Sequence, residues 1–202
     1  DNEVYNDVVK RRDAERINGV LVGLESEVNW FKTSNMKDAN VSPVVTELFK
    51  KHWGIKKEFR NIYFYEAPEV NNEVVEISQG EVVQQIINQA EIAYKNFTYK
   101  EKNPYSDIFL TAPTGAGKSL LFQVPAFYLS EKYNLVTIII SPLIALMKDQ
   151  VNALKTDRGF EKVAYINSEL SLTDREEIIN DTHDGNIDIL YLSPELFLSY
   201  SI

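Results

Sequence analysis

The sequence predicts an α/β fold in which a parallel sheet alternates with helices. Residues 135–140 are an apolar, β-branched run, which is typical of a strand buried on both faces, and residues 162–166 and 187–192 are predicted to be further strands. A segment with helix-start signals or helical periodicity follows each run. A glycine-rich turn at residues 111–119 lies between another apolar run and a helical pattern. Strands alternating with helices imply right-handed crossovers and a parallel sheet.

The individual elements follow from local signals. Residues 106–110 are predicted to form the strand before the glycine-rich turn, and apolar residues at helical spacing follow that turn. Ser141-Pro142 and Ser193-Pro194 are expected to cap helices, and Thr173 with Glu176 forms a capping-box pattern. Because ligands gather at the carboxyl ends of parallel strands, we expect the turn and both Ser-Pro pairs to lie on one rim. The apolar stripe of the first expected helix consists of Leu120, Leu121, Val124 and Phe127, and that of the next consists of Leu143, Leu146, Met147, Val151 and Leu154.

Residues 1–75 are predicted to form a small α+β accessory region of unknown role, and residues 76–202 the main domain. In the accessory region, residues 17–24 and 60–65 have strand character, and a helix is expected from Ser42-Pro43 to Gly54. The main domain opens with a helix beginning at Glu81, followed by a polar loop over residues 96–104.

Composition limits the function classes. The chain is 44% hydrophobic and 25% charged, as in soluble globular proteins, and it has no cysteine for disulfides or cysteine-based metal sites. His52 and His183 are too far apart in sequence to predict a metal site. The charged start and the interrupted apolar run at residues 135–147 predict no membrane contact, so we expect a cytoplasmic protein. The net charge of −9 argues against non-specific nucleic-acid binding, although a local groove can overcome it.

A basic segment, Lys50-Lys-His-Trp-Gly-Ile-Lys-Lys57, has two interpretations. It is either a nucleic-acid patch with Trp53 for stacking or a solvated helix end, where lysines are favoured by the helix dipole. We favour the second.

The glycine-rich turn has the chemistry of a phosphate site. Gly115 and Gly117 permit the backbone angles with which converging N–H groups hold phosphate oxygens. Lys118 would reach the β- and γ-phosphates of a nucleotide, and the Ser119 hydroxyl would ligate Mg²⁺. The expected cofactors are therefore ATP and Mg²⁺. The expected nucleotide-binding residues of this turn are Ala112, Pro113, Thr114, Gly115, Ala116, Gly117, Lys118, Ser119 and Leu120, with Lys118 and Ser119 as the catalytic ones.

Several segments carry a family resemblance. Residues 112–126, APTGAGKSLLFQVPA, resemble motif I of superfamily 2 helicases in its RecQ-group version, and residues 140–151, ISPLIALMKDQV, resemble the RecQ form of motif Ia. Residues 165–168 and 192–196 resemble the next two DNA-contacting motifs, in the family's order. The resemblance covers residues 79–202. It implies a RecA-like P-loop NTPase domain, the first half of an ATP-dependent DNA helicase.

The resemblance also implies site residues. Side chains after the strands would contact the backbone of single-stranded DNA without reading its sequence. They are Ser141, Pro142, Lys148, Gln150, Asn167, Ser168, Ser193 and Glu195. The family's adenine-recognising glutamine matches Gln79 best, with Gln84 and Gln85 as rivals, and the usual aromatic-arginine lead-in is absent beside it.

Hydrolysis needs groups that these motifs do not supply. The family's acidic pair follows an apolar strand beyond the Ser193-Pro194-Glu195 motif, but none of the seven residues after Glu195 is acidic. The arginine finger would come from a second, C-terminal RecA-like domain. We therefore expect an incomplete helicase half, whose partners are that domain and single-stranded DNA, and which binds but hardly hydrolyses ATP.

Other function classes remain open. An RNA helicase or translocase would share motif I, and a non-catalytic nucleotide-binding module would need only the phosphate turn. A P-loop kinase is disfavoured, because we find neither an acceptor site nor lid arginines in the sequence.

Overall fold

The computed structural model describes residues 41–65, 74–110, 112 and 115–199. These fall into two compact units, one containing Val41 and Phe59–Ala116, the other Ser42–Glu58 and the described part of Gly117–Ile202. The boundary expected at residue 75 stays a prediction, and the strand expected at residues 17–24 lies outside the described residues. No helix in the described ranges is long and apolar enough to cross a membrane.

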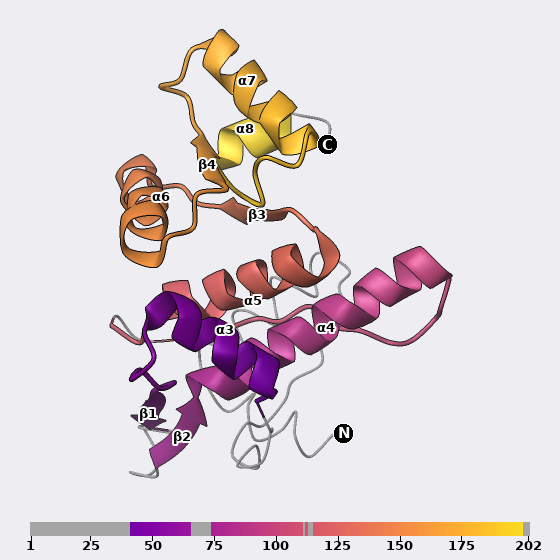
Figure 1. Cartoon of the computed structure of the whole chain (residues 1–202), viewed down its shortest axis with the longest axis vertical. Helices are drawn as coiled ribbons and strands as arrows, with labels where there is room; N and C mark the ends of the chain where they lie inside the picture. The colour runs from indigo at the N-terminus through magenta and orange to yellow at the C-terminus, as the bar shows by residue number, and fades with distance from the viewer. Residues whose placement is uncertain (1–40, 66–73, 111, 113–114, 200–202) are drawn as a thin grey trace. The chain divides into compact units, whose positions relative to one another are not determined.

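In the described part of the first unit, two antiparallel strands are followed by a long helix (Figure 1). Strand β1 (Asn61–Tyr65) pairs antiparallel with β2 (Val74–Ser78), and Asn61 lies opposite Ser78. Helix α4 (Gln79–Tyr99) begins directly after β2, because Ser78 caps it in a capping box with Glu81. The strand at residues 60–65 is thus confirmed, whereas β2 was not predicted, and α4 extends into the expected polar loop.

The strand predicted at residues 106–110 is wrong, because these residues adopt no regular secondary structure. Ile108, Phe109 and Leu110 are 43%, 56% and 40% exposed. An apolar β-branched run predicts a strand only where another strand lies beside it to complete the backbone hydrogen bonds. Among the described residues, this segment joins neither sheet.

The second unit contains the predicted parallel sheet. Its strands lie in the order β3-β5-β4, and Ile140 and Ile166 both pair with Leu192. The four residues of β5 are all buried, as expected for a central strand. The elements are α3 (Pro43–Trp53), α5 (Lys118–Tyr133), β3 (Thr137–Ile140), α6 (Ile144–Arg158), β4 (Val163–Ile166), α7 (Leu172–His183), β5 (Ile189–Leu192) and α8 (Pro194–Ser199).

Helix starts in this unit match the sequence only in part. The Ser42 hydroxyl caps α3 by accepting from the Val45 N–H at 3.3 Å, as predicted. The predicted cap of α6 is wrong, because its N-cap residue is Leu143. The predicted capping box of α7 is also wrong, because the cap is Ser171, two residues before Thr173. Serine and threonine side chains bond to nearby backbone in several turn types, so each such residue offers competing starts.

An aromatic cluster joins α3 to α5 within the second unit. The Phe127 ring lies 5.6 Å from the Trp53 ring and 4.3 Å from the Phe160 ring, measured between centroids. The Arg158 guanidinium lies over Trp53 at 5.0 Å, and Lys51 pairs with Glu131 at 2.6 Å. Trp53 is therefore a packing residue, which supports the helix-end interpretation of the basic segment.

Candidate functional site

The start of α5 has the geometry of an anion site. Gly117 precedes the helix at φ 75°, a left-handed conformation that residues with a Cβ rarely adopt. Lys118 is the exposed first residue of α5, and the half-buried Ser119 follows it. The first turn contains no acidic residue. The helix start therefore offers backbone N–H groups and a cationic side chain, and no carboxylate lies within its own first turn.

The other residues predicted for the phosphate turn differ in exposure. Gly115 is exposed with φ 83°, Ala116 is buried, and Ala112 and Leu120 are half-buried. Pro113 and Thr114 lie outside the described residues.

Gln79 contacts the backbone of the phosphate turn within the first unit. It is the first residue of α4 and is 1% exposed. Its Nε2 donates to the Ala116 carbonyl at 2.9 Å, and its Oε1 accepts from the Arg60 N–H at 3.0 Å. The rival Gln84 instead donates to Asn88 one turn along α4. Among the glutamines considered, Gln79 is thus the one shown in contact with the turn.

Arg60 lies beside Gln79 although the two residues are far apart in sequence. The β1–β2 hairpin returns the chain so that the Gln79 N–H donates to the Arg60 carbonyl at 2.9 Å, across 19 positions. The Arg60 Nη2 also lies 3.5 Å from the Gly115 carbonyl oxygen. Glycine at position 80 allows the Phe59 ring to pack closely against the start of α4, because a Cβ there would lie 2.8 Å from that ring. Phe59 and Arg60 thus form an aromatic-arginine pair that lies next to residues 79–80 in the structure, whereas no such pair directly precedes Gln79 in the sequence.

Three polar residues follow the three parallel strands at the same edge. Ser141 follows β3, Asn167 follows β4, and Ser193 follows β5. The Ser141 N–H donates to the Leu192 carbonyl at 2.9 Å, and the Ser193 N–H donates to the Ile166 carbonyl at 3.2 Å. The prediction of one common rim is therefore confirmed for both Ser-Pro pairs, whereas for the glycine-rich turn it stays a prediction. We call residues 141–142, 167–168 and 193–195 the strand-end rim.

Residues of the strand-end rim differ in what they expose. Asn167 and Ser193 are 0% and 1% exposed, so their side chains support the rim from inside. Ser141 is half-buried, and Pro142, Ser168 and Glu195 are exposed.

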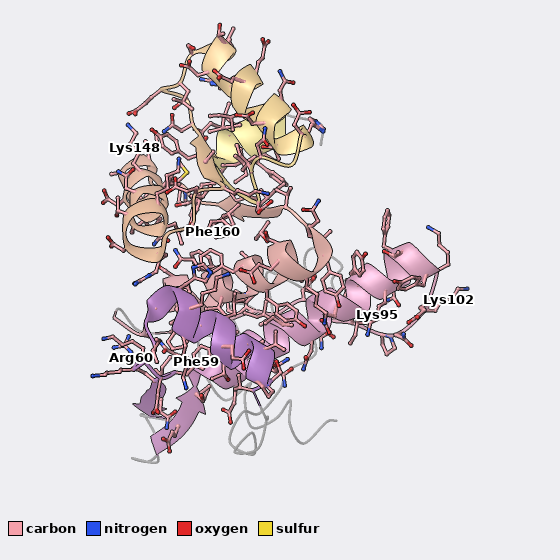
Figure 2. The ribbon with its side chains drawn as sticks, in the orientation of Figure 1. Phe59, Arg60, Lys95, Lys102, Lys148 and Phe160 are labelled. Carbon is pink, nitrogen blue, oxygen red and sulfur yellow. The ribbon has the colours of Figure 1, made fainter. Side chains whose placement is uncertain are left out.

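Lys148 projects from α6 (Figure 2) and pairs with Glu169, which follows β4. The distance from Nζ to Oε2 is 2.6 Å, and both side chains are partly exposed. This hydrogen bond to the Glu169 carboxylate raises the pKa of Lys148. A DNA phosphate at Lys148 would have to displace Glu169.

Gln150, the remaining residue of the predicted DNA surface, points elsewhere. Its Nε2 donates to the Ser119 hydroxyl at 2.7 Å, and its Oε1 lies 3.2 Å from the Tyr191 hydroxyl. The structure therefore brings Gln150 to the start of α5.

Comparison with known proteins agrees with this geometry. Residues 74–202 match the family described as DEAD/DEAH box helicase, which is more than half of the chain. This chain belongs to the DEAD/DEAH box helicase family. Its RecA-like α/β fold accordingly contains the parallel sheet of the second unit.

Curated relatives point to the RecQ branch of this helicase family. The chain is 42% identical over 97 residues to ATP-dependent DNA helicase Q5 of Mus musculus, covering 47% of this chain and 9% of the relative. It is 44% identical over 87 residues to ATP-dependent DNA helicase RecQ of Bacillus subtilis, covering 43% and 14%. It is 41% identical over 90 residues to ATP-dependent helicase SGS1 of Saccharomyces cerevisiae, covering 45% and 6%. The aligned part of this chain spans less than a fifth of each of these relatives.

Proposed function

We propose that this chain is the ATP-binding part of a RecQ-like, ATP-dependent DNA helicase. The observation that carries the proposal is the start of α5, where left-handed Gly117 leads into Lys118 and Ser119 at a helix N-terminus inside a helicase-family domain. Relatives named as ATP-dependent DNA helicases support ATP as the nucleotide and DNA as the track.

In this proposal the phosphates bind at the start of α5. Lys118 would hold the β- and γ-phosphates with the backbone N–H groups of residues 115–120. Mg²⁺ fits the Ser119 hydroxyl, because this ion takes few protein ligands and completes its shell with phosphate oxygens and water.

Gln79 would recognise adenine, with Arg60 beside it. The support for Gln79 is its contact with the Ala116 carbonyl, since this contact ties the amide to the phosphate turn itself. Its amide carries both a donor and an acceptor, as hydrogen bonding to adenine requires.

Single-stranded DNA would bind along the strand-end rim. Backbone N–H groups, the Ser141 and Ser168 hydroxyls and Lys148 would contact phosphates without reading bases. Asn167 and Ser193, which are buried, would fix the shape of this surface.

We also propose that this chain alone hydrolyses ATP negligibly. The β5 strand continues into Ser193-Pro194 and not into an acidic pair. The groups that orient water and offset transition-state charge would come from other parts of the whole protein.

Binding measurements test the proposal. A fluorescent, non-hydrolysable ATP analogue should bind the chain with Mg²⁺, and the complex should bind single-stranded DNA more tightly than the nucleotide-free chain does. Equal binding of RNA and DNA would favour the RNA translocase alternative. Nucleotide binding that does not change the affinity for nucleic acid would favour the alternative of a non-catalytic nucleotide-binding module. Steady ATP turnover that is lost in Lys118→Ala would contradict the proposal of negligible hydrolysis.

A further inference from the structure

Gln150 is a polar residue on the buried face of α6. Met147, Val151 and Leu154 form that face and are 0%, 3% and 1% exposed. Gln150 lies one helical turn from both Met147 and Leu154, so its side chain belongs to the same stripe. A polar group in such a position needs hydrogen-bond partners from neighbouring elements.

The Gln150 amide has partners on three sides. Its Nε2 donates to the Ser119 hydroxyl oxygen at 2.7 Å. Its Oε1 accepts from Gln123 Nε2 at 2.9 Å and from the Tyr191 hydroxyl at 3.2 Å. Gln123 lies one turn after Ser119 on α5, whereas Tyr191 lies on the central strand β5. The network therefore connects the start of α5 to α6 and to the centre of the sheet.

The two donors at Oε1 fix which way the Gln150 amide faces. Tyr191 is 1% exposed, and burial raises the pKa of its hydroxyl, so this group keeps its proton at neutral pH. With the tyrosine hydroxyl and the Gln123 amide donating to Oε1, the N–H side of Gln150 is turned toward Ser119.

We propose that Gln150 is a positioning residue that orients the Ser119 hydroxyl as a ligand for Mg²⁺; this inference rests on the proposed nucleotide site. A hydroxyl oxygen has two lone pairs. The Gln150 N–H occupies one and limits rotation of the side chain, which leaves the other lone pair in a fixed direction for the metal. Groups that orient a metal ligand in this way change metal affinity by about 10- to 100-fold when they are removed.

The test compares nucleotide affinity with and without Mg²⁺. The probe is a fluorescent, non-hydrolysable ATP analogue, titrated in excess Mg²⁺ and in EDTA. Gln150→Met keeps a side chain of similar length and removes the amide, whereas Gln84→Ala changes a glutamine on α4 outside the network. We expect Gln150→Met to reduce the Mg²⁺-dependent gain in affinity by about tenfold and to leave affinity in EDTA unchanged. Gln84→Ala should match wild type.

A double variant separates coupling from independent damage. If Gln150 acts through Ser119, then Gln150→Met combined with Ser119→Ala should lose no more of the Mg²⁺-dependent gain than Ser119→Ala alone. The nucleotide-free variants should show the same non-additivity in melting temperature, because the two side chains are in direct contact.

Each contrary result has a distinct meaning. Equal weakening by Gln150→Met in Mg²⁺ and in EDTA would reduce the residue to a packing role and overturn the inference. Loss of single-strand binding with an intact Mg²⁺-dependent gain would assign Gln150 to DNA contact instead. If Gln150→Met leaves the Mg²⁺-dependent gain in nucleotide affinity unchanged while Lys118→Ala abolishes nucleotide binding, the inference is overturned and the proposed function stands. Absence of any nucleotide binding by wild type would overturn both.

Discussion

The start of α5 and the strand-end rim both carry clear sequence motifs, but they differ in which polar atoms solvent reaches. At the start of α5, Lys118 is exposed and the hydroxyl-bearing Ser119 is half-buried. On the rim, Asn167 and Ser193 are buried at 0% and 1% exposure. A motif therefore identifies the elements that meet a ligand, whereas exposure decides which atoms make the contact. At the helix start, backbone N–H groups and the exposed Lys118 side chain are proposed to make the contact. On the rim, backbone groups, the Ser141 and Ser168 hydroxyls and the neighbouring Lys148 are proposed to do so.

Lys118→Ala should separate the two regions most strongly. We expect nucleotide affinity to fall about a hundredfold, because a charge-assisted contact to phosphate is lost, while nucleotide-free binding of single-stranded DNA stays unchanged. Equilibrium titration with the fluorescent analogue and with a labelled oligonucleotide measures both. Lys132→Ala, which removes a lysine from the last turn of the same helix, is the matched control. Equal effects of the two substitutions would remove the special role of Lys118.

Gln79→Ala should sharpen the comparison by testing a buried side chain on the nucleotide side. We expect about a tenfold loss of the preference for ATP over GTP, since one hydrogen-bonding partner of the base is removed. Competition by ATP and by GTP against the bound analogue measures this preference. Gln85→Ala, at the rival position, should leave it unchanged. Equal losses for both nucleotides would make Gln79 only a support of the phosphate turn.

Local signals predicted the second unit well. The apolar runs that became β3, β4 and β5 have short β-branched patterns that need no knowledge of distant residues. The cap of α3 at Ser42 and its end at Gly54 also follow from single residues. The strand-end rim followed in turn, because parallel strands with helical crossovers must end at a common edge.

The features that local sequence patterns did not predict depend on contacts between segments that are distant in the sequence. Arg60 and Gln79 meet only because the β1–β2 register places Asn61 opposite Ser78, and β2 itself was overlooked despite its β-branched start. The run at residues 106–110 resembles a strand but has no strand beside it among the described residues. Gln150 carried a usable signal, since a glutamine within the Met147–Leu154 stripe indicates a buried polar contact.

Tyr191→Phe tests the buried network between the two regions. We expect a loss of about 1 kcal/mol in the free energy of unfolding at pH 7, because the hydroxyl bonds to Gln150 and Gln123 disappear. The raised pKa means that the folded state holds this proton more tightly than the unfolded state. Its contribution is therefore complete below the ordinary tyrosine pKa of 10.0 and is lost as pH rises through the raised value.

Urea unfolding at several pH values measures this contribution. Stability of wild type should fall more steeply than that of Tyr191→Phe above pH 10.0. Parallel curves for the two proteins would show that the hydroxyl titrates alike in both states. The contribution of the Tyr191 hydroxyl to stability would then not depend on pH.

Glu169→Gln tests whether DNA bound at the rim also uses the neighbouring Lys148 side chain. Glu169 holds Lys148 at 2.6 Å, and the contact is partly open to solvent, so the pair contributes little to stability. Removing the carboxylate frees the lysine for a phosphate, and we expect affinity for single-stranded DNA to rise about threefold, with a steeper dependence on salt.

The net charge changes from −9 to −8, since one acidic residue is lost. Glu131→Gln makes the same change at another lysine pair, Lys51–Glu131. An equal rise in both variants would mean that only net charge matters, and the rim would then bind DNA through its backbone without help from Lys148.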